Sequence, residues 1–340
     1  MKLSTVAVLL VSLAGLTACE PERDPSTTTP AAPESRPAAG ADESSDTGAT
    51  PPQTVALVVK TRTNPFFEAM ERGAREAADA RSLEFVIKAA TRESAAEQQR
   101  VIVDQLIDDD VAAIVIAPLD TAALLPALAH AQRAGIVLIN VDDRLDAALL
   151  HDAGVAPIPF VGVDNVEGAY RGATYLAANH PSRRRRARTK AAIIEGIPAT
   201  ANSRQRKRGA ERAFAEHRHI ELVAIEIGNW RIDDGHAATQ RLLRAHADLG
   251  IIYCANDMMA LGAVRALAEA GNDKVLVGGY DGIDEARAAV RAGTLAVTVD
   301  QQAAIQGRRG VELAAAALAD AAVPSETFVE VALITATSSP

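Results

Sequence analysis

The feature that most constrains the fold is a repeated alternation between short apolar segments and longer amphipathic ones, beginning at residue 54. The first apolar segment, at 54–59, is rich in valine and has no polar alternation, as expected of a buried strand. Strand candidates lie at 54–59, 84–88, 112–117, 136–141, 159–163, 190–195, 221–227, 251–254, 275–279, 295–299 and 328–333. Helix candidates lie at 65–82, 94–107, 121–134, 167–179, 205–216, 233–246, 258–270 and 302–320. This pattern indicates parallel sheets flanked by helices, and so many strands favour two similar α/β lobes.

The first nineteen residues have the segment order of a secretory signal. Lys2 is followed by an apolar run at 3–16 and by Leu16-Thr17-Ala18-Cys19. This ending resembles a bacterial lipobox, in which the cysteine is lipidated and becomes the new amino terminus. The run is shorter than the roughly 20 residues that a membrane span needs. We therefore expect 1–19 to be a lipoprotein signal peptide and the protein to lie in the cell envelope, lipid-anchored through Cys19 to a bacterial membrane and facing the periplasm or the exterior.

Residues 20–52 have a different composition from the rest of the chain. They consist mainly of Pro, Ala, Ser, Thr and acidic residues, with almost no large apolar side chains. Such a segment cannot bury enough apolar surface to offset the entropy that it loses on ordering. We predict a disordered tether between the lipid anchor and a folded region that starts at residue 53.

Charge and cysteine content narrow the class of protein further. The formal net charge of −9 disfavours nucleic acid as a partner. The arginine run at 183–186 has no interleaved aromatic residues, and it is interpreted as part of a solvated loop. Cys254 is the only cysteine besides Cys19, so no disulfide is expected, and its apolar surroundings predict a buried thiol.

Polar residues follow the strand candidates where a ligand would bind, since ligands of open parallel sheets lie beyond the carboxyl ends of the strands. Many of these residues are Asp, Asn, Gln or Arg, whose planar groups can make two hydrogen bonds at once. Such pairs match the vicinal hydroxyls of a sugar or polyol. Aromatic residues make up only 3% of the chain, yet Phe66, Phe67 and Trp230 all fall in these loops, where they could pack against the apolar face of a sugar ring.

Four motifs carry a resemblance to a known family. They are Asn64-Pro65-Phe66-Phe67, the Gly-Val-Asp-Asn-Val-Glu-Gly segment at 162–168, the Asn-Asp-Met-Met-Ala-Leu-Gly-Ala segment at 256–263 and the Val-Gly-Gly-Tyr-Asp-Gly segment at 277–282. Together they resemble the periplasmic sugar-binding proteins of the ribose-binding type, which have the type I periplasmic binding protein fold. The effector domains of lac-type repressors share that fold. A repressor would begin with a helix-turn-helix, whereas this chain begins with a lipobox.

The resemblance covers about residues 53–335 and implies a two-lobed clamp. The lobes would comprise 53–163 plus 302–327 and 164–301 plus 328–340, joined by three hinge crossings near Asp164, Gln301 and Phe328. Phe66, Phe67 and Trp230 would sandwich the sugar ring. The polar ligand-binding residues implied are Asn64, Asp142, Asp143, Arg206, Asn256, Asp281 and Gln301, with Asn202 as a further candidate.

Two departures from the ribose-binding pattern bear on the ligand. Ribose binders usually have arginine after the aspartate that corresponds to Asp142, whereas this chain has Asp143 there and Arg144 one position later. The segment at 196–206, interpreted as a loop, is also longer than in ribose binders. A pocket built for particular hydroxyls rejects analogues that leave its polar groups unpaired. We therefore predict a sugar or polyol other than ribose.

The function that we expect is a substrate-binding lipoprotein of an ABC importer, acting as a monomer that closes around its ligand and needs no cofactor. A sugar-sensing module that presents its ligand to a chemoreceptor or a histidine kinase remains an alternative, because it would use the same clamp. An enzyme is less favoured: Asp142 and Asp143 are adjacent and cannot easily flank a glycosidic bond. No metal is expected, because His217 and His219 have no third ligand nearby in sequence.

Overall fold

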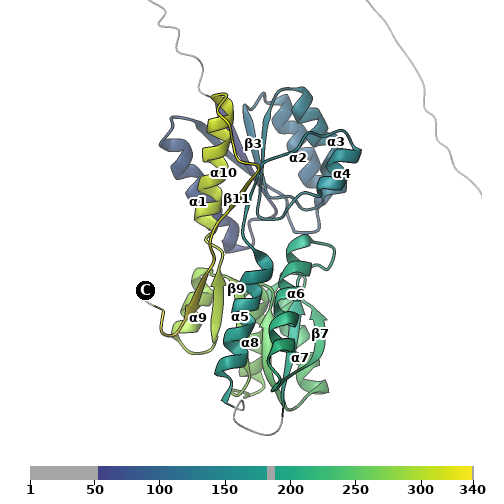
Figure 1. Ribbon diagram of the computed structural model, residues 1–340, viewed down its shortest axis with the longest axis vertical. Coiled ribbons are helices and arrows are strands. Elements are labelled where there is room, and N and C mark those ends of the chain that lie inside the picture. Colours follow the sequence, from purple (N-terminus) through teal and green to yellow (C-terminus); the bar gives the residue numbers. More distant parts are fainter. Residues whose placement is uncertain (1–52, 182–187, 339–340) are drawn as a thin grey trace, which may run out of the picture. The chain divides into compact units, whose positions relative to one another are not determined.

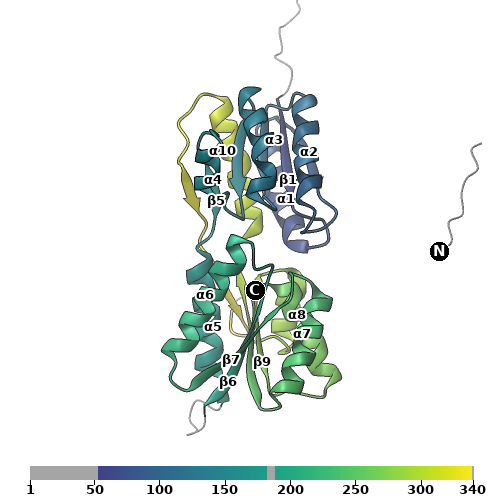
Figure 2. The ribbon, with the colours of Figure 1, turned by 90° about the vertical axis from the view of Figure 1, so that its right-hand side faces the viewer.

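The computed structural model describes residues 53–181 and 188–338. The expected signal peptide, Cys19, the tether and the arginine run at 183–186 lie outside these residues. Within them, no helix is both long enough and apolar enough to cross a membrane. The described part of the chain forms two α/β lobes, each built on a six-stranded sheet (Figures 1 and 2).

The sheet of the first lobe is entirely parallel, with the order β11-β5-β4-β3-β1-β2. Its strands are β1 (Thr54–Val59), β2 (Glu84–Ala89), β3 (Ala113–Ile116), β4 (Val137–Val141), β5 (Phe160–Gly162) and β11 (Glu326–Phe328). Its helices are α1 (Pro65–Asp79), α2 (Ala96–Asp108), α3 (Thr121–Arg133), α4 (Ala147–Asp152) and α10 (Ala303–Leu318). Helices α1 and α10 pack together on one face, and α2 and α3 cover the other (Figure 1).

The sheet of the second lobe has the order β12-β10-β9-β8-β6-β7, and only the β10–β12 pair is antiparallel. Its strands are β6 (Thr189–Glu195), β7 (Ile220–Ile227), β8 (Leu249–Cys254), β9 (Leu276–Asp281), β10 (Val297–Asp300) and β12 (Ala332–Thr335). Its helices are α5 (Asn165–Asn179), α6 (Ala201–Glu216), α7 (Ile232–Ala245), α8 (Asp257–Glu269) and α9 (Asp284–Arg291). Helices α5 and α6 lie on one face, and α7 and α8 on the other (Figure 2).

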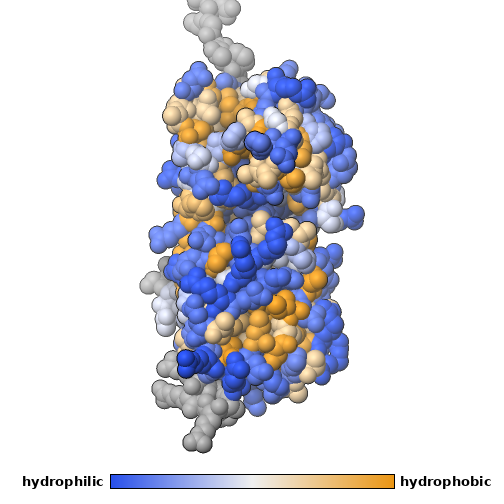
Figure 3. All heavy atoms as spheres, turned by 45° about the vertical axis from the view of Figure 1, so that its right-hand side comes forward, coloured by the Kyte–Doolittle hydropathy of each residue, from blue (hydrophilic) through white to orange (hydrophobic). Residues whose placement is uncertain are grey.

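The expected α/β architecture of two lobes is confirmed. Both sheets are buried between helices, which explains the unalternated apolar strands: Val55 to Val59 in β1 and Ile251 to Cys254 in β8 have no exposed surface. Cys254 is buried, as predicted. On the face drawn in Figure 3, hydrophilic residues predominate where the two lobes meet, and hydrophobic residues gather lower down on the second lobe.

Within the described residues the chain passes three times between the two sheets. It passes from β5 to α5 around Asp164, from β10 to α10 around Gln301, and from β11 to β12 after Phe328. The third passage corrects the single strand predicted at 328–333, because β11 and β12 belong to different sheets. Val329 and Val331 between them are buried, so the apolar run continues through the passage and conceals it in the sequence.

One further prediction about the elements is wrong, and two helices were missed. The segment at 196–206 is not a loop throughout, because α6 begins at Ala201, where the side chain of Thr200 caps the helix by accepting a hydrogen bond from the amide of Ser203. The first turn contains Asn and Ser, which are weak helix formers, and this hides the start of the helix. The short helices α4 and α9 were not predicted, because six to eight residues carry little periodic signal.

Candidate functional site

Twelve side chains from both lobes surround one small space of about 280 Å³. This space is called the interlobe cavity below. Ten of the eleven predicted ligand residues line it, and Asp143 lies directly behind them. The lining residues are Lys60, Asn64, Phe66, Phe67, Glu93, Asp142, Asn202, Arg206, Trp230, Asn256, Asp281 and Gln301.

The topology explains why residues so distant in sequence meet here. Lys60 follows β1 and Asp142 follows β4 in the first lobe, while Asn256 follows β8 and Gln301 follows β10 in the second. Parallel strands all end at the same edge of a sheet, and the two carboxyl edges contribute to one cavity. These four side chains therefore converge although they are far apart in sequence.

Two capping asparagines belong to this set. Asn64 caps α1 by accepting a hydrogen bond from the amide of Phe66 at 3.0 Å, and Asn256 caps α8 by accepting one from Met259 at 3.0 Å. Each therefore uses its carbonyl oxygen for the helix and presents its NH₂ group elsewhere. The NH₂ group of Asn256 donates to the backbone oxygen of Trp230 at 3.3 Å. That of Asn64 makes no hydrogen bond with any described residue.

Three lining residues have backbone conformations that side chains other than glycine rarely adopt. The φ angles are +64° at Asp142, +65° at Trp230 and +126° at Asp281. Each such conformation costs roughly 1–3 kcal/mol, and these conformations concentrate at functional sites. They turn the chain at three strand ends so that the side chains enter the cavity.

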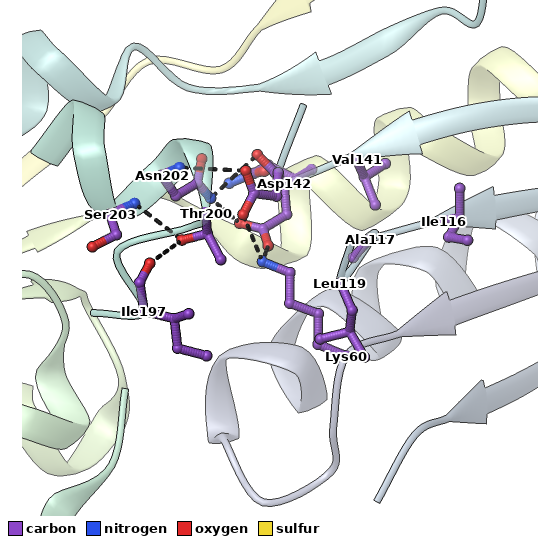
Figure 4. Close-up of polar contacts among 12 residues, drawn as sticks. Lys60, Ile116, Ala117, Leu119, Val141, Asp142, Ile197, Thr200, Asn202 and Ser203 are labelled. Atoms are coloured by element: carbon purple, nitrogen blue, oxygen red, sulfur yellow. Dashed lines mark hydrogen bonds and ion pairs between the residues drawn. The ribbon is translucent and has the colours of Figure 1, made fainter. Parts of the chain in front are cut away.

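The first-lobe side of the cavity holds a buried cluster of three charges. The ammonium of Lys60 lies 2.8 Å from a carboxylate oxygen of Asp142 and 3.2 Å from one of Asp143. Figure 4 shows Lys60 extended toward Asp142, with Asn202 on the other side of that carboxylate. Burial by itself lowers the pKa of Lys60, but Asp142 and Asp143 outweigh it, and the pKa is raised overall. Burial raises the pKa of Asp143, while Lys60 opposes the rise.

On the second-lobe side, the guanidinium of Arg206 is held in place by several partners. It donates hydrogen bonds to Asn165 Oδ1 at 2.7 Å, to the backbone oxygen of Ala255 at 2.9 Å and to Asp281 Oδ1 at 3.2 Å. It also lies over the ring of Tyr280, 3.9 Å from the centroid. Burial raises the pKa of Asp281 despite the lowering effect of Arg206.

Asn202 connects the two sides. Its NH₂ group donates to Asp142 Oδ1 at 3.1 Å, and its backbone amide donates to Asp143 Oδ1 at 3.3 Å. Its side-chain oxygen accepts a hydrogen bond from Asn165 at 3.0 Å. Because Asn202 lies in the first turn of α6 and both aspartates follow β4, these contacts join one lobe to the other.

Three aromatic side chains form apolar walls of the cavity. Phe66 and Phe67 pack edge to face, with centroids 5.1 Å apart, and both are also part of the core. Trp230 is 7% exposed, and its ring packs on Gly196, where a Cβ atom would lie only 2.2 Å from the indole. Gly196 therefore makes room for the ring.

Arg144 lies outside the interlobe cavity. Its guanidinium stacks on the ring of Phe160, 4.1 Å from the centroid, and pairs with Glu326 of β11. It does not line the cavity, whereas Asp143, one position earlier, faces Lys60. The position after Asp142 thus holds an anion that faces Lys60, and the cation one position later lies outside the cavity.

Two lining residues, Lys60 and Glu93, were missed by the sequence analysis. Lys60 could have been found, because it directly follows β1 as the other site residues follow their strands. Glu93 comes four residues after β2, in the segment before α2, and nothing local marks it. It is half-buried; burial raises its pKa to about 7, while Lys60 lowers it.

His217 and His219 lie with ring centroids 5.8 Å apart, and no group of three potential metal ligands occurs in the described residues.

Comparison with known proteins gives consistent results. Residues 55–322 match the family model described as a periplasmic binding protein domain. The D-ribose/D-allose-binding protein of Pseudomonas aeruginosa is 38% identical over 268 residues, which is 78% of this chain and 82% of that protein. The D-allose-binding periplasmic protein of Escherichia coli is 36% identical over 260 residues, 76% of this chain and 82% of that protein.

Among solved structures, a periplasmic solute-binding protein of an ABC transporter from Actinobacillus succinogenes 130z, with bound D-allose, superposes with a TM-score of 0.79. It is 36% identical, and the match covers 84% of this chain and 98% of that one.

Proposed function

The chain belongs to the periplasmic binding protein family, and on that premise we propose that it is the substrate-binding lipoprotein of an ABC importer for a monosaccharide or polyol. Like the relatives described above, it is a binding protein rather than an enzyme, and the family is extracytoplasmic. In this proposal residues 1–19 are the signal peptide and 20–52 the tether. The lobes comprise 53–163 plus 302–327 and 164–301 plus 328–340, and Cys19 carries the lipid of a monomeric protein.

The observation that supports this proposal most strongly is the composition of the interlobe cavity. Charged and amide groups from both lobes alternate there with three aromatic walls. Planar hydrogen-bonding groups suit vicinal hydroxyls, and the aromatic rings suit the C–H faces of a sugar ring. The space is small and enclosed by twelve side chains, which favours one sugar ring over an oligosaccharide.

The proposed mechanism is closure of the lobes about the three crossings. Asp142 on one lobe and Asp281 on the other can bind the same ligand only when the lobes are together. A ligand that bridges them shifts the equilibrium toward the closed form by its difference in affinity for the two forms. A permease that recognises the closed pair of lobes would then receive only the loaded protein.

Binding and closure can be tested together. We expect D-allose or myo-inositol to raise the melting temperature more than D-ribose does, because a ligand that binds only the folded protein stabilises it more the more tightly it binds. Small-angle scattering should show compaction with the same compound. Trp230→Ala should weaken binding by about 30- to 150-fold, as the loss of about 2–3 kcal/mol of aromatic packing implies.

Phe85→Ala is the matched control, because Phe85 is a half-buried aromatic residue of β2 that neither lines the cavity nor lies at a crossing. We expect it to bind as the wild type does. A wild type that none of the three compounds stabilises or compacts would contradict the proposed function. Equal affinity in the Trp230→Ala variant would contradict this site.

A further inference from the structure

One carboxyl group of the interlobe cavity has no partner. Asp142 and Asp143 face Lys60, and Asp281 accepts hydrogen bonds from Arg206 and Gln301. The side chain of Glu93, by contrast, makes no hydrogen bond or ion pair with any residue that the structure describes. Its carboxyl group is therefore available to a ligand.

The position of Glu93 places it where a ligand would enter. Besides the interlobe cavity, three wider hollows open between the lobes, and two of them adjoin Glu93, one beside Trp230 and one beside the N-terminus of α3. Glu93 is the one residue that lines the cavity and both hollows. Ile197 of the second lobe lines both hollows with it. Glu93 thus stands at the boundary between the cavity and its openings.

The charges around Glu93 are unbalanced. Lys60 at the end of β1 and Arg206 on α6 bring two positive charges, but both already face aspartates. Asp142 and Asp143 at the end of β4 bring like charges. Burial, supported by these two aspartates and opposed by the two cations, raises the pKa of Glu93 to about 7. A neutral carboxylic acid is therefore accessible to this side chain near physiological pH.

We propose that Glu93 is a specificity-determining residue that hydrogen-bonds a hydroxyl of the ligand as a neutral carboxylic acid, so that closure takes up a proton. This inference rests on the proposed function. The acid O–H donates to one ligand oxygen, and the carbonyl oxygen accepts from a second group. A neutral sugar or polyol is then bound without an unpaired anion being enclosed.

The sign of the pH dependence follows from linkage. In an open molecule the exposed carboxyl has its ordinary pKa of 4.5, and on closure the pKa rises to about 7. The closed form therefore binds the proton more tightly, and affinity is highest below 4.5 and falls as the pH rises through 7. Each pH unit within that window lowers the affinity by up to about tenfold.

The test measures D-allose binding by titration calorimetry between pH 5 and pH 8. From pH 5 to pH 8 the wild type should lose about ten- to a hundredfold in affinity. Glu93→Gln, which mimics the neutral acid, should bind about as well as the wild type at pH 5 and lose much less affinity toward pH 8. In buffers of different ionisation enthalpy at pH 6, the wild type should take up nearly one proton per ligand, and Glu93→Gln much less.

Glu221→Gln is the matched control, because Glu221 is an exposed carboxyl on β7 that forms no ion pair with any described residue. It should reproduce the wild-type pH profile. Identical pH profiles in the wild type and Glu93→Gln would overturn the inference while leaving the proposed function intact. So would an affinity for D-allose that rises with pH, which would mean that Glu93 accepts hydrogen bonds from the sugar as a carboxylate. A wild type that binds none of D-allose, D-ribose and myo-inositol would contradict the proposed function, and this inference with it.

Discussion

The two sides of the interlobe cavity are built on the same fold but differ in electrostatics. On the second-lobe side, one cation, Arg206, faces one carboxylate, Asp281, and is bonded further to neutral groups of its own lobe. On the first-lobe side, one cation, Lys60, lies between two carboxylates, and a third carboxyl, Glu93, is unpaired. The second-lobe side is thus held in place by its own contacts, whereas the first carries excess negative charge.

The capping asparagines show the same difference. Asn256 in the second lobe uses both its carbonyl oxygen and its NH₂ group within the protein. Asn64 in the first lobe uses only its oxygen, which leaves two N–H donors for a ligand. The second lobe is preorganised by its own contacts, so we expect it to orient the ligand. The first lobe has free donors and acceptors, so we expect its hydrogen bonds to change when the ligand binds.

Removing the cation of the first lobe should have the largest effect. Lys60→Met leaves Asp142 and Asp143 buried without their counter-ion, which should lower the free energy of unfolding by about 3–5 kcal/mol. Burial raises the pKa of Asp143 in the folded protein, where it then binds protons more tightly than in the unfolded chain, so the variant should lose stability as the pH rises from 5 to 8. Urea unfolding at several pH values measures both effects.

Lys88→Met is the control for this change, because Lys88 on β2 is exposed and has no ion pair within the part of the chain that the structure describes. Its unfolding free energy should stay within about 0.5 kcal/mol of the wild type. If Lys60→Met were as stable as this control at pH 8, the first-lobe cluster would not depend on its lysine, and the contrast between the lobes would fail.

An intermediate effect is expected where the two sides meet. Asn202→Ala removes the side-chain hydrogen bond that crosses from α6 to Asp142, and this bond exists only when the lobes are together. The affinity for D-allose should fall by about tenfold, the equivalent of roughly 1.4 kcal/mol. Calorimetry measures the affinity, and scattering without ligand should show a larger radius of gyration.

Ser203→Ala is the neighbouring control. Its hydroxyl is buried but has no hydrogen-bond partner, so its removal should not weaken closure. Equal affinities in the Asn202→Ala and Ser203→Ala variants would show that the interlobe bond contributes nothing to binding.

The smallest effect should come from Arg144, the cation that lies outside the cavity. Arg144→Ala removes the stacking on Phe160 and a partly exposed ion pair with Glu326. The loss of both contacts should lower the free energy of unfolding by about 1 kcal/mol. The affinity for D-allose should change by less than about twofold. Calorimetry and urea unfolding separate the two quantities, and a large loss of affinity would place Arg144 in the site after all.

Much of the site could be predicted because each residue carries a local signal. Asn64 and Asn256 start helices, Asp142 and Gln301 follow apolar strands, and the family-like motifs surround them. The start of α6 was missed because its first turn is a poor helix former. The passage from β11 to β12 was missed because an apolar segment between two sheets has the same composition as a strand.

The sequence by itself determined the alternation of strands and helices, and hence which residues lie at the carboxyl edges of two sheets, because periodicity and helix caps act over a few residues. Only the tertiary structure decided which of these residues face one another. Nothing near Asp143 in sequence indicates that it pairs with Lys60 while Arg144 turns to Phe160, or that Glu93 is left unpaired. Those outcomes depend on strand order and on the contact between the two lobes. Both bring together charges that are far apart in sequence, so no local sequence pattern can indicate which of them will pair.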